Sequence, residues 1–415
     1  MTASTLRKAI CFGEAGVIKP VSTNSQYLAY EFGAGSGNYA NLDLIQDTGT
    51  RWIRLWAHLP TFWPTENYIN PYYRDQLDYQ IALAKVYGCG VILTIHHDLP
   101  EWINDSTNTR AAPPASRLST TGAWTNMFRT FARRYSLANT SRPYNGYSYV
   151  DILEFTNEPN GLMQVGIGGD LVGTVATMFK RAKEVAASIP PVAGYGRSPL
   201  IGGPAASDIG PGKGSSRDYD TFTTSLLARL SNTGFYVVGA DEACLWTHHN
   251  YSDVTYDHGL STIAPDRASY GGGNPNYNRY ILRSNVVRNL LLGYSWRGWP
   301  DANPINPRIF ITEGGAKRSS VEDFWGVPKR GQPGFTEEGY ENYQNFLVYR
   351  NLRDRMATDT EGAGIELLTN YLMITADLAE NNQFDTGLYR AADASAPLLP
   401  RSVSYNTWKP FPGRL

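Results

Sequence analysis

The chain has 415 residues, with 37 basic and 38 acidic side chains that leave a formal net charge of −1. Charged residues make up 18% of the chain and aromatic residues 13%, so hydroxyl and amide groups supply much of its polarity. This balance argues against nucleic acid or an anionic membrane surface as a partner and suits a neutral ligand. The three cysteines lack the spacing of a thiolate zinc site.

Composition also bears on the cellular compartment. No segment approaches the roughly 18 consecutive apolar residues of a membrane span, and the first residues lack the apolar stretch of a signal peptide. A low-charge chain rich in Tyr, Asn and Gly resembles exported enzymes. We therefore expect a secreted protein whose leader is not part of this sequence.

Short apolar segments recur along the chain, and each has the continuous hydrophobicity of a strand buried on both faces. A first strand is expected near Tyr27–Phe32 and brings the total to eight. The other segments are Arg51–Ala57, Val91–His96, Asp151–Asn157, Leu200–Pro204, Ala243–His249, Arg308–Glu313 and Ile365–Tyr371.

Segments of helical character separate these strands. Tyr72–Tyr87 ends at Gly88 and leads directly into the next strand, as a helix closed by a C-terminal glycine does. Two other segments repeat apolar residues at helical spacing, which predicts helices that pack on a sheet. Their apolar residues are Trp124, Phe128, Phe131, Ala132 and Tyr135 in one, and Val175, Met178, Phe179, Ala182 and Val185 in the other.

The alternation of strand and helix predicts a single (β/α)8 barrel, a TIM barrel, over residues 1–415. No linker rich in Pro or Ser divides the chain. A doubly wound sheet is disfavoured because the cluster Gly33–Gly37 has the G-x-G of a dinucleotide-binding turn but no third glycine at the spacing G-x-G-x-x-G requires. Long loops are expected at Asp98–Thr121, Ser207–Asp218, Asp253–Asn278 and Gly314–Thr336.

Two glutamates stand where a barrel builds its active site, at the C-terminal ends of strands. Glu158 follows the fourth strand and Glu313 ends the seventh, on roughly opposite sides of the ring. Glycoside hydrolysis needs such a pair, because a protonated carboxyl donates to the leaving oxygen while an ionised one attacks the anomeric carbon. We expect Glu158 to be the acid/base and Glu313 the nucleophile. Arg54 and Tyr251 are expected to orient Glu313, and Asn157 to meet a sugar hydroxyl.

These motifs, taken in chain order, resemble those of the retaining glycoside hydrolases of clan A, the 4/7 superfamily. Family 5 is the nearest and family 39 the second choice. The resemblance implies a (β/α)8 barrel, a carbohydrate substrate, and acid/base and nucleophile roles for the two glutamates. It rests on Asn157-Glu158-Pro159, Ile311-Thr312-Glu313-Gly314, Arg54, His96 and His249-Asn250-Tyr251.

Further residues are expected to bind the sugar. The resemblance favours His96 over its neighbour His97, since only one of two adjacent strand residues points into a barrel. His249 is favoured over His248 because it shares a strand face with Tyr251. Aromatic rings stack on pyranose faces. The expected platforms are Trp56, Trp102 and Trp246. Either Tyr371 or a Trp of a neighbouring loop is expected to replace the Trp that family 5 normally has at the end of its eighth strand.

Other functions stay open at this point. The presence of both glutamates argues against a carbohydrate-binding protein on an inactive barrel, whereas a transglycosylase would use the same residues. A metal-dependent barrel hydrolase could use His96, His97, His248 and His249, but the chain has no His-x-His motif. We expect no metal and no cofactor. The sugar, the linkage, exo or endo action and the oligomeric state are left open.

Overall fold

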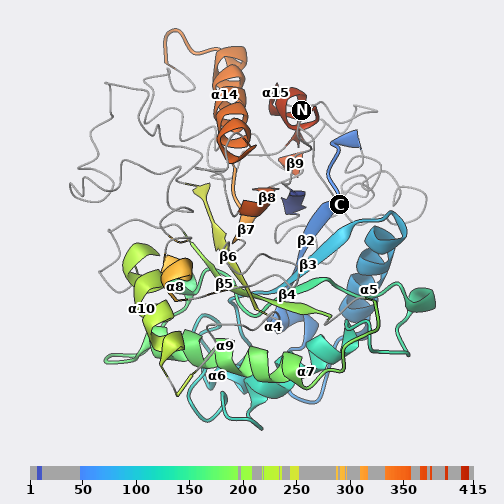
Figure 1. Ribbon diagram of the computed structural model, residues 1–415, viewed down its shortest axis with the longest axis vertical. Helices are drawn as coiled ribbons and strands as arrows, with labels where there is room; N and C mark the ends of the chain where they lie inside the picture. Colours follow the sequence, from blue (N-terminus) through green and yellow to red (C-terminus); the bar gives the residue numbers. More distant parts are fainter. Residues whose placement is uncertain are drawn as a thin grey trace.

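A closed barrel of parallel strands forms the centre of the protein in the computed structural model (Figure 1). Each strand from β1 to β8 pairs with the next, and β8 pairs in parallel with β1, which closes the ring. The predicted (β/α)8 fold is confirmed. The structure describes residues 7–11, 47–194, 198–207, 217, 219–232, 234–235, 244–251, 287, 290–294, 296, 309–315, 332–356, 365–371, 374–375, 388–390 and 403–410. The strands are β1 (Arg7–Cys11), β2 (Trp52–Ala57), β3 (Gly90–Ile95), β4 (Ile152–Glu154), β5 (Leu200–Ala206), β6 (Cys244–His249), β7 (Ile309–Glu313) and β8 (Ile365–Tyr371).

Helices cover the outside of the barrel (Figure 1). The three predicted helices are present as α5, α7 and α9, and their apolar faces are buried against the strands. The helices are α4 (Leu59–Phe62), α5 (Pro71–Val86), α6 (Glu101–Asn104), α7 (Ala123–Arg134), α8 (Pro159–Leu162), α9 (Leu171–Ala187), α10 (Tyr219–Ser231), α14 (Glu337–Met356) and α15 (Val403–Trp408). A 3-10 turn, η2 (Tyr144–Gly146), and a small parallel sheet of β9 (Ile374–Thr375) and β10 (Tyr389–Arg390) complete the described elements.

The ends of α5 show how the sequence sets a boundary. The Asn70 side chain accepts a hydrogen bond from the backbone N–H of Tyr72 at 3.1 Å, which satisfies one of the free donors of the first turn. Beyond the C-terminal end, Gly88 has a φ of +75°, a left-handed conformation that glycine adopts without steric cost. The chain then enters β3 directly.

The position of the first strand was predicted wrongly. Tyr27–Phe32 lies outside the described residues, and β1 at Arg7–Cys11 takes the place between β8 and β2. Its sequence, RKAIC, begins with two basic residues and so does not look like a buried strand. Lys8 is nevertheless buried, because its ammonium donates to the carbonyls of Thr48, Trp408 and Lys409 at 3.2, 2.8 and 3.4 Å. Burial lowers the pKa of Lys8 to about 8.

The interior of the barrel is layered. Seven strands each contribute one side chain to an apolar cluster inside the ring: Trp52, Ile92, Ile152, Leu200, Leu245, Phe310 and Leu367. Side chains two residues further along a strand lie on the same face, so the next layer follows from the sequence. That layer is polar on most strands, with Arg54, Thr94, Glu154, Thr247, Thr312 and Thr369. The residues predicted to form the active site follow this layer, at the C-terminal ends of the strands.

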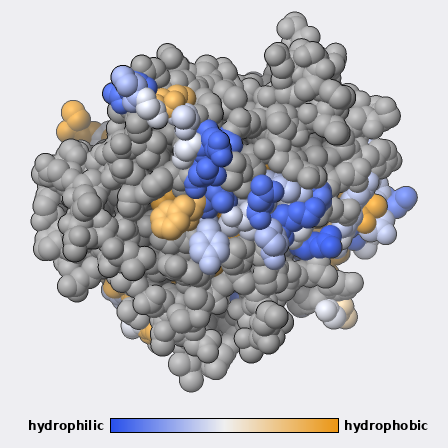
Figure 2. Space-filling model, turned by 90° about the horizontal axis from the view of Figure 1, so that it is seen from above, coloured by the Kyte–Doolittle hydropathy of each residue, from blue (hydrophilic) through white to orange (hydrophobic). Residues whose placement is uncertain are grey.

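The surface is mixed in character. On the face seen in Figure 2, hydrophilic residues predominate among those coloured, and hydrophobic residues occur singly. None of the helices in the described part of the chain combines the length and apolar character needed to cross a bilayer.

Candidate active site

Glu313 ends β7, and its carboxylate accepts hydrogen bonds from one residue of β2 and one residue just after β6. Its Oε2 accepts a hydrogen bond from Nη1 of Arg54 at 2.9 Å, and its Oε1 accepts one from the hydroxyl of Tyr251 at 2.7 Å. An irregularity in the pairing of β6 with β7 places His249 opposite Glu313 rather than opposite Thr312. A carboxylate that accepts on both oxygens is fixed in orientation, as a reacting group must be.

Glu158 approaches the same point from β4. Its backbone lies in the left-handed region, with a φ of +44°, and its N–H donates to the carbonyl of Ala205 at 2.9 Å. Such a conformation is costly for a residue other than glycine and is often found at functional sites. Oε1 of Glu158 lies 2.8 Å from Nδ1 of His249, whose Nε2 lies 3.7 Å from Oε2 of Glu313. Carboxylate oxygens of the two glutamates lie within 4.8 Å of each other.

His249 determines where the proton of this group resides. Burial lowers the pKa of His249, but the charge of Glu313 and the hydrogen bond with Glu158 outweigh it and raise the pKa above its usual range. Burial raises the pKa of Glu158, but the hydrogen bond and charge of His249 outweigh it and lower the pKa to about 2. These two shifts favour a charged imidazole beside an ionised Glu158. Glu158 is the predicted acid/base, and the histidine 2.8 Å away is placed to exchange a proton with it.

Beneath the two glutamates, Arg54 organises the polar layer of the barrel. Its side chain is fully buried and donates through Nε to Glu154 at 2.8 Å and through Nη2 to Asn157 at 2.8 Å, besides the bond to Glu313. The Thr94 hydroxyl also donates to Oε2 of Glu154, at 2.5 Å. Burial raises the pKa of Glu154, but the Arg54 charge and the Thr94 hydrogen bond outweigh it and hold that pKa below its usual range.

Sequence reasoning missed Glu154. The signal was present, because an acidic residue within the apolar run Ile152–Phe155 must face inward and needs a cationic partner once buried. Asn157, predicted to meet a sugar hydroxyl, has its Oδ1 bound to Arg54 and is 2% exposed.

Both adjacent histidines after β3 are buried. β3 ends at Ile95, so the alternation of strand faces, on which the choice of a single histidine rested, does not extend to His96 and His97. The His96 ring packs on Trp56, with centroids 5.1 Å apart, and on His97, at 3.8 Å. Burial and the neighbouring His96 lower the pKa of His97 to about 3, so His97 is uncharged at neutral pH.

The predicted aromatic platforms differ in position. Trp56 shares the inner face of β2 with Arg54 and lies 5% exposed against His96. Trp102 is half-buried on α6, where its Nε1 donates to the carbonyl of Trp63 at 2.9 Å. The Tyr371 backbone ends β8, and its side chain lies outside the described residues.

The prediction for Trp246 is wrong. Trp246 is fully buried and packs edge-on against Trp296, at 5.8 Å, in the core between barrel and helices. It lies three residues before His249, and an odd separation places two strand residues on opposite faces. The same alternation puts His248 on the outer face, where its ring lies 5.7 Å from that of Tyr219.

A family model described as cellulase (glycosyl hydrolase family 5) matches residues 17–278. The chain belongs to glycoside hydrolase family 5. It is a glycosidase, and Glu158 falls inside the matched part whereas Glu313 follows it. No curated protein sequence matches the chain.

Solved structures of family 5 enzymes share the fold. A lichenase from Caldicellulosiruptor sp. F32 is similar at a TM-score of 0.54 and 14% identity, covering 98% of this chain and 93% of that one. A subfamily 18 enzyme of family 5 from Streptomyces cattleya, in complex with Manβ1-4GlcNAc, reaches 0.58 and 14%, covering 97% and 79%. A family 39 glycoside hydrolase from Bacteroides cellulosilyticus WH2 is also similar, at 0.51 and 13%, covering 99% and 64%. The second-choice family thus has the same fold.

Proposed function

We propose that this family 5 glycosidase hydrolyses β-glycosidic bonds with net retention, through a covalent glycosyl-enzyme on Glu313. One observation carries the proposal: carboxylate oxygens of Glu158 and Glu313 lie within 4.8 Å of each other. Retaining enzymes hold their carboxyl groups ~5–5.5 Å apart, whereas inverting enzymes need ~6.5–9.5 Å to admit a water molecule. The short separation supports direct attack by one carboxylate.

The contacts of Glu313 suit a nucleophile. Arg54 and Tyr251 each donate a hydrogen bond to a different oxygen of Glu313, which orients the carboxylate for attack. In the first step a Glu313 oxygen forms a bond to the anomeric carbon, and the bond from that carbon to the leaving oxygen breaks.

The leaving oxygen takes a proton from Glu158, and His249 resupplies it. His249 is buried, has a raised pKa and lies 2.8 Å from Oε1 of Glu158. In the second step Glu158 accepts a proton from an attacking water while the ester bond to Glu313 breaks, and the proton returns to the pair. Two residues thus perform the acid/base work that the sequence assigned to Glu158 alone.

The substrate is proposed to be a neutral β-linked oligosaccharide or polysaccharide of glucose or mannose units. The net charge of −1 leaves no strong field for a charged sugar. Among similar structures, the Caldicellulosiruptor lichenase is also known as a mutant in complex with cellotetraose, and the Streptomyces cattleya enzyme is bound to Manβ1-4GlcNAc.

Turnover of a panel of β- and α-linked aryl glycosides and of β-glucan and β-mannan oligosaccharides tests the proposal, with Glu313→Gln beside the wild type. We expect activity on β-linked members only, an initial product of β configuration by NMR, and loss of activity in Glu313→Gln. The exposed Glu101 offers a charge-matched control, because it is not one of the residues assigned to the site. An α-configured first product from a β substrate would refute retention, and full activity of Glu313→Gln would refute the nucleophile.

The same panel separates the remaining alternatives. Added free sugar diverts product into longer glycosides if the enzyme is a transglycosylase. Saturable binding of an oligosaccharide without any turnover would identify an inactive, carbohydrate-binding barrel.

A further inference from the structure

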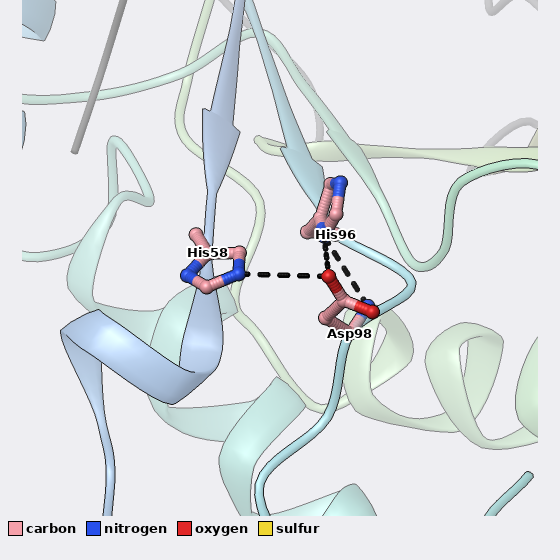
Figure 3. Close-up of side chains that lie close together, drawn as sticks. All are labelled: His58, His96 and Asp98. Atoms are coloured by element: carbon pink, nitrogen blue, oxygen red, sulfur yellow. Dashed lines mark hydrogen bonds and ion pairs between the residues drawn. The ribbon is translucent and has the colours of Figure 1, made fainter. Parts of the chain in front are cut away.

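A second cluster of ionisable side chains lies where β2 and β3 end, and it is separate from the Glu158, His249 and Glu313 group. His58 precedes α4, and His96 and Asp98 follow β3, so two neighbouring strands bring the three residues together (Figure 3). One nitrogen of each histidine and one oxygen of Asp98 lie within 4.8 Å of one another.

Oδ2 of Asp98 faces both imidazoles. It lies 3.6 Å from Nε2 of His58 and 3.5 Å from Nδ1 of His96 (Figure 3). Both distances exceed the 2.7–3.2 Å of an ordinary N–H···O hydrogen bond. Oδ1 of Asp98 has different neighbours: the Thr109 hydroxyl donates to it at 3.2 Å, Nε of Arg110 lies 3.6 Å away and Nε2 of His97 lies 3.7 Å away. These contacts hold the carboxylate and leave Oδ2 turned toward the histidines.

Each of the two rings places one nitrogen near this oxygen. Nδ1 of His58 lies 2.8 Å from the Thr61 hydroxyl, and when it donates there, Nε2 keeps a lone pair on the side of Asp98. Nδ1 of His96 accepts a hydrogen bond from the backbone N–H of Asp98 at 3.2 Å, so it too is an acceptor. A cation that displaced this long hydrogen bond would have two imidazole nitrogens and a carboxylate oxygen as ligands, and these three atoms lie within 4.8 Å of one another.

The spacing fits one class of cation. Zn²⁺ binds His nitrogen and carboxylate oxygen at about 2.0–2.2 Å in tetrahedral geometry, so neighbouring ligand atoms are about 3.3–3.6 Å apart. The distances of 3.5 and 3.6 Å from Oδ2 of Asp98 match two edges of such a tetrahedron. The Thr61 hydroxyl on the far nitrogen of His58 is the kind of outer partner that orients a metal-binding histidine.

We propose that His58, His96 and Asp98 bind a divalent transition ion of the Zn²⁺ type beside the active site. The side chain of His58 is 32% exposed and that of Asp98 17%, so the ion can enter from solvent and retain a water as its fourth ligand. The sequence analysis considered four histidines as ligands, and His58 was not among them. A metal on Nδ1 of His96 would replace the long backbone hydrogen bond there and leave Nε2 as an N–H donor.

Binding of Zn²⁺ alone to the full chain, without a histidine tag, tests the proposal. Equilibrium dialysis with metal analysis gives the stoichiometry, and the visible absorption of bound Co²⁺ reports nitrogen and oxygen ligands in a low-coordinate site. We expect one ion per chain. His58→Ala and Asp98→Asn should each weaken binding by more than about 100-fold, and Thr61→Val by about 10-fold.

Two controls keep the result specific. Glu313→Gln removes a ligand from the catalytic cluster and should leave Zn²⁺ binding intact, as should the exposed charge-matched change Glu101→Gln. Loss of binding in Glu313→Gln but not in His58→Ala would place the ion on the catalytic carboxylates and overturn the proposal. The proposal would also be overturned if the wild type did not bind one Zn²⁺ per chain. Because His58 is partly exposed, His58→Ala is expected to fold even if Asp98→Asn does not. These readouts do not depend on glycosidase activity.

Discussion

Glu154→Gln tests whether the buried ion pair under the active site holds Arg54 in place. Both side chains are 0% exposed, with Nε and Oε2 2.8 Å apart. Unit charges about 4 Å apart attract by about 4 kcal/mol at an effective dielectric constant of about 20. Removing one member of a buried pair costs about 3–5 kcal/mol. In Glu154→Gln the amide oxygen can still accept hydrogen bonds from Arg54 and Thr94, and Arg54 still donates to Glu313. We therefore expect the free energy of unfolding to fall by about 3 kcal/mol.

Urea unfolding at pH 7 measures this loss, with the exposed change Glu101→Gln as a control within about 0.5 kcal/mol of the wild type. The pKa of Glu154 is lowered in the folded protein, so its contribution is present above the ordinary glutamate pKa and is lost as the pH falls through the lowered value. The difference between wild type and Glu154→Gln should therefore shrink in acid. We also expect kcat to fall by about 10–100-fold, because Arg54 positions Glu313. A loss below about 1 kcal/mol with unchanged kcat would refute this reasoning.

Three further predictions concern the catalytic pair and the aromatic residues. Glu158→Gln should lower kcat by about 10²–10⁴-fold, with the smallest loss on substrates whose leaving group needs no proton, and an equal loss on all aryl glycosides would contradict its acid role. The pKa of His249 is raised in the folded protein, so its contribution to stability is present below its ordinary pKa and is lost as the pH rises through the raised value. Activity should fall over the same range, and an alkaline limb of kcat/KM that persists in His249→Gln would contradict this assignment. Trp246→Ala should lower the free energy of unfolding by about 3–5 kcal/mol and leave KM unchanged, whereas Trp102→Ala should raise KM several-fold. Steady-state kinetics and thermal unfolding measure both effects, and the reverse pattern would contradict the assignment of Trp246 to the core.

The sequence by itself determined the barrel, its main helices and the two glutamates. Buried parallel strands are continuously apolar and helices on their outside have a 3.6-residue period, so local patterns reveal both. The Asn-Glu-Pro and Ile-Thr-Glu-Gly motifs each end an apolar run, and a barrel brings the ends of its strands to one face. Arg54 and His249 could be placed for the same reason, since the face of each strand side chain follows from a period of two.

Only the tertiary structure decided the features that depend on contacts between distant segments. Lys8 lies in a buried strand because carbonyl groups about 40 and 400 residues away satisfy its ammonium, which no local pattern reveals. The pKa of His249 is raised because β4, β6 and β7 bring two carboxylates to one imidazole. His58 joins His96 and Asp98 because β2 and β3 are neighbours in the barrel. Strand patterns specify which face a side chain takes, whereas its charge state and partners depend on which strands the barrel places side by side.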